Sequence, residues 1–231
     1  MLSLLAVILA APLAAQDSTA VDRDLPPETE PIDVQVLRTL YAPEAGAYPL
    51  AMQIANESAY PTYYSATPLL LGATLLTDAD TRPAVRLAIT QIANFGTTRL
   101  LKNIVQRPRP YVALDDVDAR DREHQGDEVF DPHSFPSGHT SSAFAIATSL
   151  SASYPEWYVI APAMTWATAV GVSRVWLGVH YPSDVLVGAG IGAGTALLVA
   201  ILLPDSEPEG ELVPLDGVEP VPVFSFSIPI R

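Results

Sequence analysis

The sequence predicts an all-α fold, a helical bundle of about five to six core helices, because three long segments carry helical signals. Residues 82–106 repeat apolar side chains at helical spacing, and residues 137–153 open with a serine that suits a helix start. Residues 185–203 form an uncharged apolar run that ends at Pro204. With 231 residues, the chain is long enough for one domain with a sizeable core.

The composition is more apolar and less charged than that of a typical soluble domain, with 49% hydrophobic and 16% charged residues. The helices are therefore either deeply buried or in contact with a membrane. The chain has no cysteine, which excludes disulfides, and its four histidines show no metal-ligand spacing. The net charge of −14 argues against a nucleic-acid partner. Most acidic residues lie in three loop-like or terminal segments, at residues 16–35, 111–134 and 204–231.

The N-terminal segment, residues 1–15, has the apolar run and small residues of a secretory signal peptide. It lacks the usual preceding Lys or Arg, and an uncleaved membrane anchor is the alternative, although the run is short for a span of ~20 residues. Residues 16–48 predict an acidic, Pro-rich arm that packs loosely. We therefore expect an exported protein with a helical domain at residues 49–204 and an acidic, Pro-rich tail at residues 205–231.

The first two elements expected in the helical domain are a short buried helix piece at residues 68–76 and a long amphipathic helix at residues 82–106. Prolines end the second helix, because proline removes a backbone donor and restricts the preceding residue. Polar and charged side chains are expected to interrupt any lipid-facing surface of this helix: Arg86, Gln91, Asn94 and Arg99.

Three further elements follow the acidic loop at residues 111–132. A helix is expected to start near Ser137 or Thr140 and to stop at Tyr154-Pro155. Residues 157–173 predict an apolar helix with Pro162 as a kink or boundary. Residues 185–203 are long enough to span a bilayer, although the central helix of a soluble bundle is the alternative. Small residues in this run permit close helix contacts. An alternating pattern in residues 223–228 is compatible with an edge strand.

Two cations mark the end of the helix at residues 82–106. Lys102 is the only lysine of the chain, and Arg109 lies seven residues later among prolines. A solvated basic helix face is the alternative to a set of converging cations. Arginine offers a fork of N–H donors that suits phosphate oxygens, whereas lysine supplies a compact charge.

The stretch HSFPSGHTSSA, residues 133–143, combines a helix start with a histidine. Ser137 can cap the helix, and Gly138 permits close approach of a ligand to the backbone. The unpaired N–H groups of a helix N-terminus attract anions, and His139 lies at the same place. Such helix starts are common, so this stretch alone does not establish a binding site.

The stretch SRVWLGVHYPSD, residues 173–184, adds Arg174 and a histidine four residues before an aspartate. If Pro182 lies in the first turn of the last helix, Asp184 can reach back to His180. A carboxylate on one ring nitrogen fixes the tautomer and leaves the other nitrogen available for attack. Alone, such a pair is more often structural than catalytic.

Together, the three motifs resemble the type 2 phosphatidic acid phosphatase family, which shares its core with bacterial class A acid phosphatases and vanadium-dependent haloperoxidases. In order they read Lys-x6-Arg-Pro, Pro-Ser-Gly-His and Ser-Arg-x5-His-x3-Asp, and the resemblance covers about residues 60–203. It implies a phosphatase that uses no metal and no cofactor and hydrolyses phosphate monoesters or diphosphates through a phosphohistidine. The active site is expected at one end of the bundle.

The resemblance also implies residue roles. His180 is expected to be the nucleophile, oriented by Asp184, and His139 the general acid and then the base. Five residues are expected to bind the phosphoryl oxygens: Lys102, Arg109, Ser137, Gly138 and Arg174. Phosphoryl transfer needs mostly positioning and charge stabilisation, which cations and a helix N-terminus supply.

Residues next to the motifs are expected to contribute less. His133 and Tyr111 are candidates for the cavity entrance, with packing within the loop as the alternative. Arg99 and Arg107 are expected at the surface or behind the site.

The substrate is expected to be a lipid phosphate, a prenyl diphosphate or a small phosphate ester. The apolar run at residues 185–203 favours membrane association, with the site on the non-cytoplasmic side, whereas acidic tails favour a periplasmic enzyme. A vanadium-dependent haloperoxidase is the alternative function, with His180 as the axial ligand of vanadate. Residues 111–134 show no aromatic halide pocket, which disfavours it. A catalytically inactive envelope scaffold is a second alternative.

Overall fold

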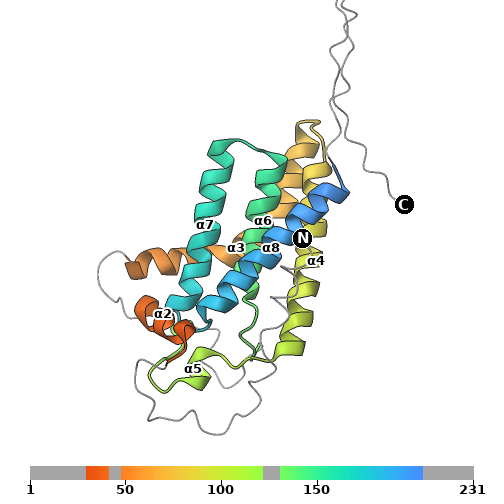
Figure 1. Ribbon diagram of the computed structural model, residues 1–231. Coiled ribbons are helices and arrows are strands. Elements are labelled where there is room, and N and C mark those ends of the chain that lie inside the picture. Colours follow the sequence, from red (N-terminus) through yellow and green to blue (C-terminus); the bar gives the residue numbers. More distant parts are fainter. Residues whose placement is uncertain (1–29, 42–47, 122–130, 205–231) are drawn as a thin grey trace, which may run out of the picture.

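The computed structural model describes residues 30–41, 48–121 and 131–204, and these residues form seven helices (Figure 1). The predicted all-α fold is confirmed. The predicted signal peptide, the C-terminal tail and the edge strand within that tail lie outside the described residues. The helices are α2 (Ile32–Tyr41), α3 (Tyr48–Leu76), α4 (Arg82–Val105), α5 (Pro110–Ala113), α6 (Gly138–Ser153), α7 (Trp157–Trp176) and α8 (Pro182–Leu202).

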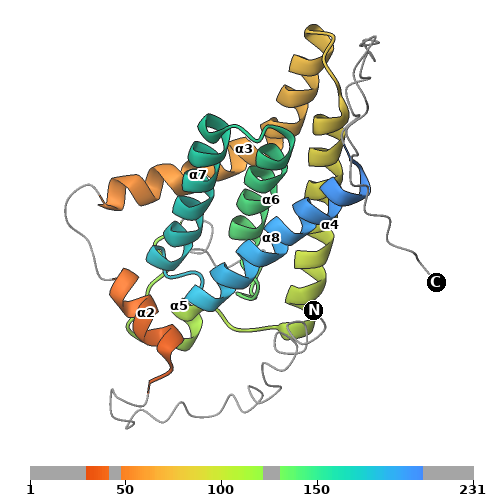
Figure 2. The same cartoon turned by 45° about the horizontal axis from the view of Figure 1, so that its top comes forward.

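Helix α6 is the centre of the bundle and contacts α3, α4, α7 and α8. It begins where the sequence predicted, with Ser137 as its N-cap, and it ends before Pro155. Figure 2 shows α3 crossing behind α7 and α6 before it rises beside α4. Pro162 is accommodated inside α7.

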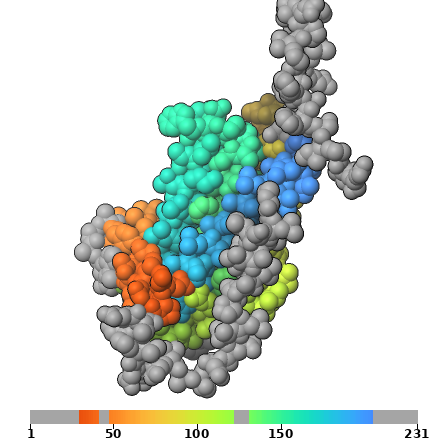
Figure 3. All heavy atoms as spheres, in the orientation of Figure 1, coloured from red at the N-terminus to blue at the C-terminus, as the bar shows by residue number. Residues whose placement is uncertain are grey.

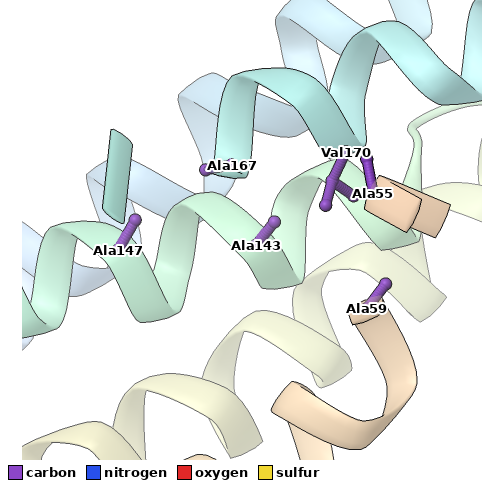
Figure 4. Packing of buried hydrophobic residues seen from close by; sticks show 6 residues of the cluster. All are labelled: Ala55, Ala59, Ala143, Ala147, Ala167 and Val170. Atoms are coloured by element: carbon purple, nitrogen blue, oxygen red, sulfur yellow. The ribbon is translucent and has the colours of Figure 1, made fainter. Parts of the chain in front are cut away.

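Small side chains bring these helices close together. Gly188 and Gly192 face α6, and an added Cβ would lie 2.6 Å from the carbonyl oxygen of Ser137 and 2.1 Å from that of Ser141, respectively. The contact between α6 and α8 therefore depends on the absence of side chains at two positions one turn apart. On the opposite side of α6, six small residues fill the core (Figure 4): Ala55, Ala59, Ala143, Ala147, Ala167 and Val170.

Helix α4 presents its polar side to the interior. Arg86, Asn94 and Lys102 are at most 4% exposed, whereas Ile92 and Phe95 are 74% and 71% exposed. The prediction that Arg86 and Asn94 interrupt a lipid-facing surface is wrong, because both side chains point into the bundle. An outward apolar face with an inward polar stripe is the reverse of a soluble amphipathic helix.

The predicted helix piece at residues 68–76 is the last part of the 29-residue helix α3, but the prediction that this piece is buried is wrong. Leu69, Leu75 and Leu76 are 69%, 63% and 88% exposed. The reason is visible in Figure 2, where the α3–α4 tip extends beyond α6 and α7. The apolar composition of residues 68–76 therefore did not indicate that this segment is buried.

Helix α2 lies inside the range for which the sequence predicted a loosely packed arm. Its buried residues, Val34 and Leu37, are three apart and pack into a core cluster with Val175 and Tyr181. Figure 3 shows α2 (red-orange) directly beside the start of α8 (light blue). This helix therefore supports the turn that leads into α8.

Candidate active site

A cavity of about 510 Å³ lies at the end of the bundle where α6 begins and α4 ends. Three tyrosines of α3 and Phe95 of α4 form much of its apolar wall. Five of the eight predicted site residues line this cavity: Lys102, Arg109, Gly138, His139 and His180. The other three are buried behind the wall: Ser137, Arg174 and Asp184.

His180 lies in the turn before α8 and is 2% exposed. As the spacing predicted, Pro182 begins α8 and Asp184 reaches back, so that its Oδ2 lies 3.5 Å from Nδ1 of His180. The same Oδ2 accepts a hydrogen bond from the backbone N–H of Tyr181 at 2.8 Å. Gly178 makes this turn possible, because its φ is +73° and an added Cβ would meet the carbonyl oxygen of Asp118 at 2.6 Å.

Asp184 is fully buried and is held by residues that the motifs did not indicate. Nη1 of Arg107 donates to its Oδ1 at 2.9 Å, and Nη2 of Arg107 donates to Asp33 at 2.7 Å. Asp33 also accepts hydrogen bonds from the backbone and the hydroxyl of Ser183. A single guanidinium thus links α2 to the first turn of α8. Arg107 therefore lies behind the site and holds Asp184, which agrees with the expectation that it lies at the surface or behind the site.

Burial lowers the pKa of His180 well below its ordinary value of 6.5, and the positive charges of Arg109, Lys102 and Arg174 lower it further. The imidazole is therefore neutral at physiological pH. Its Nε2 lies 3.3 Å from Nη1 of Arg109, next to the cations of the cavity. A neutral nitrogen beside a cation is suited to attack on an anionic group.

Lys102 and Arg109 are held mainly by backbone carbonyl groups. Nζ of Lys102 donates to the carbonyl oxygen of His133 at 2.7 Å. Arg109 donates through Nη1 to the carbonyl oxygen of Val179 at 3.0 Å and through Nε to that of Asp131 at 2.9 Å. These contacts fix both cations at the cavity wall without neutralising them.

Arg174 is placed differently from the other two cations. It is fully buried, it does not line the cavity, and its Nη2 pairs with Asp121 at 2.6 Å. Its Nη1 donates to Asn56. Arg174 therefore does not touch the cavity, but its positive charge contributes to the lowered pKa of His180.

The first residues of α6, Gly138 and His139, line the cavity. Ser137 accepts hydrogen bonds from the backbone N–H and the hydroxyl of Thr140, and its own N–H donates to the carbonyl oxygen of Asp184 at 3.0 Å. A Cβ on Gly138 would lie 3.9 Å from Cε of Lys102, so this part of the backbone faces the lysine. The start of α6 is therefore bonded to the first turn of α8 and lies close to Lys102.

His139 stands on an aromatic surface of α3. Its ring centroid lies 4.8 Å from that of Tyr60 and 6.0 Å from that of Tyr63. The hydroxyl of Tyr63 donates to the carbonyl oxygen of His139 at 2.7 Å. His139 and His180 line the same cavity, so a group bound between them is accessible to both rings.

The neighbouring residues divide into different roles. His133 supplies a carbonyl oxygen to Lys102, and Tyr111 packs against the cluster that contains Trp176; neither lines the cavity. Arg99 does line it. Among the described residues, no three His, Cys, Asp or Glu side chains are grouped as metal ligands.

Relatives with known names share this part of the chain. It is 36% identical over 103 residues to a lipid A 1-phosphatase of Rhizobium johnstonii, which covers 45% of the chain and 41% of that protein. It is 32% identical over 140 residues to the undecaprenyl-diphosphatase BcrC of Bacillus subtilis, which covers 58% of the chain and 62% of that protein. The chain thus matches less than half the length of the lipid A phosphatase.

Two solved structures share the fold. Aquifex aeolicus LpxE has a TM-score of 0.60 and 28% identity, covering 77% of this chain and 99% of that one. The transmembrane PAP2 type phosphatidylglycerolphosphate phosphatase of Bacillus subtilis has a TM-score of 0.58 and 22% identity, covering 74% and 83%. The sequence profile of the PAP2 superfamily matches residues 83–207, which include all three motifs. The chain therefore belongs to the PAP2 superfamily.

Proposed function

We propose that this protein is a metal-independent phosphatase that hydrolyses lipid phosphate monoesters or diphosphates through a covalent phosphohistidine. The observation that carries this proposal is the position of a neutral, buried His180 between the carboxylate of Asp184 and the cations Lys102 and Arg109. The cations suit phosphoryl oxygens, and the histidine suits attack on phosphorus.

In the first step, Nε2 of His180 attacks phosphorus, the P–N bond forms, and the bond from phosphorus to the leaving oxygen breaks. His139 donates a proton to that oxygen. Lys102, Arg109 and the backbone at Gly138 stabilise the charge on the remaining oxygens, and Asp184 stabilises the positive charge on His180.

In the second step, water attacks phosphorus and His139 accepts its proton. The P–N bond breaks, phosphate leaves, and His180 returns to its neutral form. His139 is thus an acid in one step and a base in the next.

A lipid substrate is supported by the surface around the cavity. Tyr64 and Phe95 line the cavity and are 76% and 71% exposed, which places an apolar surface next to the cations. Among the described residues, helix Pro182–Leu202 is long and apolar enough to cross a membrane, and only 22% of its most apolar window is buried. The outward apolar face of α4 also suits lipid. These surfaces support a membrane location, and we propose, as the sequence predicted, that the site faces the non-cytoplasmic side.

Purified protein in detergent tests this function. Phosphate release is measured from a long-chain alkyl phosphate, a prenyl diphosphate and p-nitrophenyl phosphate, each with EDTA present. We expect release from the lipid substrates, and brief reaction with ³²P-labelled substrate should leave an acid-labile phosphoryl group on the protein. Bromide oxidation with added vanadate, without phosphate release, would overturn the proposal in favour of a haloperoxidase. Retention in the membrane after a carbonate wash tests the localisation.

We expect kcat/KM to fall in acid only below pH 6.5, and we call this falling part of the pH profile the acid limb. The lowered pKa of His180 keeps Nε2 unprotonated, and hence nucleophilic, at pH values where an ordinary histidine is charged. The lowered pKa also predicts that the free energy of unfolding falls as the pH drops below 6.5. The reason is that the unfolded chain then binds a proton at His180 that the native protein does not bind. The limb is measured with substrates of different phosphate pKa, which separates enzyme from substrate titration. A limb at or above pH 6.5 contradicts the assignment.

Arg107→Gln is expected to lower kcat about 10- to 100-fold, because Asp184 loses its cationic partner and orients His180 less well. The acid limb should also move to higher pH, since the unpaired carboxylate favours protonated His180. Arg38→Gln is the matched control, because Arg38 pairs with Glu30 and Asp116 at the surface. An equal effect of both substitutions on kcat would show that Arg107 has no specific connection to the nucleophile.

A further inference from the structure

One carboxylate in the cavity has no part in the proposed reaction. Asp131 lines the cavity, and its Oδ2 lies 3.0 Å from Nζ of Lys102 and 3.6 Å from Nη2 of Arg109. Its Oδ1 lies 4.0 Å from Nη1 of Arg99. Asp131 therefore contacts the two cations that the proposed function assigns to the phosphoryl oxygens.

The surroundings of Asp131 differ from those of a fixed structural ion pair. The side chains of Asp121 and Arg174 are 6% and 0% exposed and lie 2.6 Å apart, outside the cavity. The side chain of Asp131 is 25% exposed, and its contacts with two of its three cations are long. Water can solvate Asp131 once it leaves the cations, so that its displacement costs little compared with breaking a buried pair.

Lys102 and Arg109 do not depend on the Asp131 side chain for their positions. Lys102 keeps its bond to the carbonyl oxygen of His133, and Arg109 keeps its bond to that of Val179. Arg109 also donates to the carbonyl oxygen of Asp131, which any side-chain substitution retains. The carboxylate of Asp131 is thus paired with two cations, Lys102 and Arg109, that backbone carbonyl groups already hold in place.

We propose that Asp131 is an affinity-determining residue, an internal competitor that a phosphoryl group must displace from Lys102 and Arg109. The inference rests on the proposed phosphoryl site. A phosphoryl dianion carries more charge and more acceptor oxygens than one carboxylate, so it wins this competition, but with reduced net affinity. The competition lowers the affinity for substrate and for released phosphate alike, which limits inhibition by product.

The single lysine gives a direct measurement that does not require turnover. Protein labelled with ¹⁵N only at lysine Nζ has one labelled signal, from Lys102, provided that any affinity tag lacks lysine. Inorganic phosphate is titrated at constant ionic strength against chloride, and the shift of this signal gives Kd. The full chain is compared as wild type, Asp131→Asn, Asp131→Glu and Asp78→Asn.

Asp78→Asn is the charge-matched control. Asp78 lies at the α3–α4 turn, about 30 Å along α4 from Lys102. Its φ of 52° is a conformation that asparagine tolerates. It removes one negative charge far from the cavity, so its effect reports long-range electrostatics alone.

The expected result is a Kd for phosphate about 3- to 10-fold lower in Asp131→Asn than in wild type. Asp131→Glu and Asp78→Asn should stay near the wild-type value. If Asp131→Asn does not fold, Asp131→Ser removes the same charge and serves in its place. Equal or weaker binding by the neutral variant overturns the inference. If the Lys102 signal does not shift with phosphate in any folded variant, the proposed phosphoryl site is contradicted, and the inference with it.

Discussion

His180→Ala is expected to lower kcat for phosphate release by at least about 10⁴-fold, the largest effect of any single substitution in this chain. The reason is that the proposed reaction has no other nucleophile: Nε2 of His180 is neutral and lies beside Arg109. Alanine removes the attacking atom and leaves the cations in place, so binding of phosphate should persist. Purified variants are compared by phosphate release and by ³²P labelling.

His133→Ala is the matched control for this experiment. His133 follows the acidic loop near the site, but its contribution to Lys102 is a carbonyl oxygen, which alanine retains. We expect less than about a threefold change in kcat, since no contact with the proposed substrate is lost. A wild-type rate in His180→Ala, or comparable losses in both variants, would rule out His180 as the specific nucleophile.

His139 is distinguished from His180 by the leaving group. A general acid matters most when the leaving oxygen is basic, so His139→Ala should lose far more activity on an alkyl phosphate than on p-nitrophenyl phosphate. His180→Ala should lose both equally. Equal losses for the two substrates in His139→Ala would contradict proton donation by His139.

The sequence predicted the helical class and the three motifs because both are local properties. Periodicity and capping placed α6 with Ser137 at its start, and a four-residue spacing placed Asp184 within reach of His180. Each of these inferences depends on residues close together in the chain. The spatial convergence of the motifs came instead from the family resemblance, which supplied a fold that spacing alone does not give.

The sequence allowed Arg107 a place behind the site, but it did not indicate the contact of Arg107 with Asp184 or any part for Asp33, because these contacts join residues distant in sequence. Arg107 meets Asp184 across 77 residues, and Asp33 meets Ser183 across 150. Asp33 lies in a segment whose acidic, Pro-rich composition predicted an arm. Asp131 was likewise hidden in an acidic loop that composition assigns to solvent, although it lies on the two cations of the cavity.

Periodicity also could not tell which side of α4 is inside. A helix has the same pattern whether its apolar face meets a core or a lipid, and only packing decides. Arg86 shows the outcome: it is 4% exposed, and its guanidinium donates to the carbonyl oxygen of Leu203 and the hydroxyl of Ser153. The buried arginine thus satisfies backbone and side-chain acceptors at the ends of two helices.

The contact between α6 and α8 predicts the largest loss of stability. Gly192→Ala would place a Cβ 2.1 Å from the carbonyl oxygen of Ser141 and 2.8 Å from the backbone nitrogen of Ala145. No rotation of a side chain relieves a clash with backbone, so α8 must move away from α6. We expect the free energy of unfolding to fall by about 3 kcal/mol or more, and Tm by about 6–12 °C.

Two other glycines of α8 provide the control for Gly192→Ala. Gly190 and Gly194 lie on the exposed side of the same helix, and an added Cβ there has no neighbour within 4 Å. Alanine at either position should keep or raise Tm, because it favours the helix over glycine. Thermal unfolding of the three variants in one detergent gives the comparison. Since Asp184 lies in the first turn of α8, Gly192→Ala should also lower kcat. Equal Tm in all three variants would show that α6 and α8 do not pack this closely.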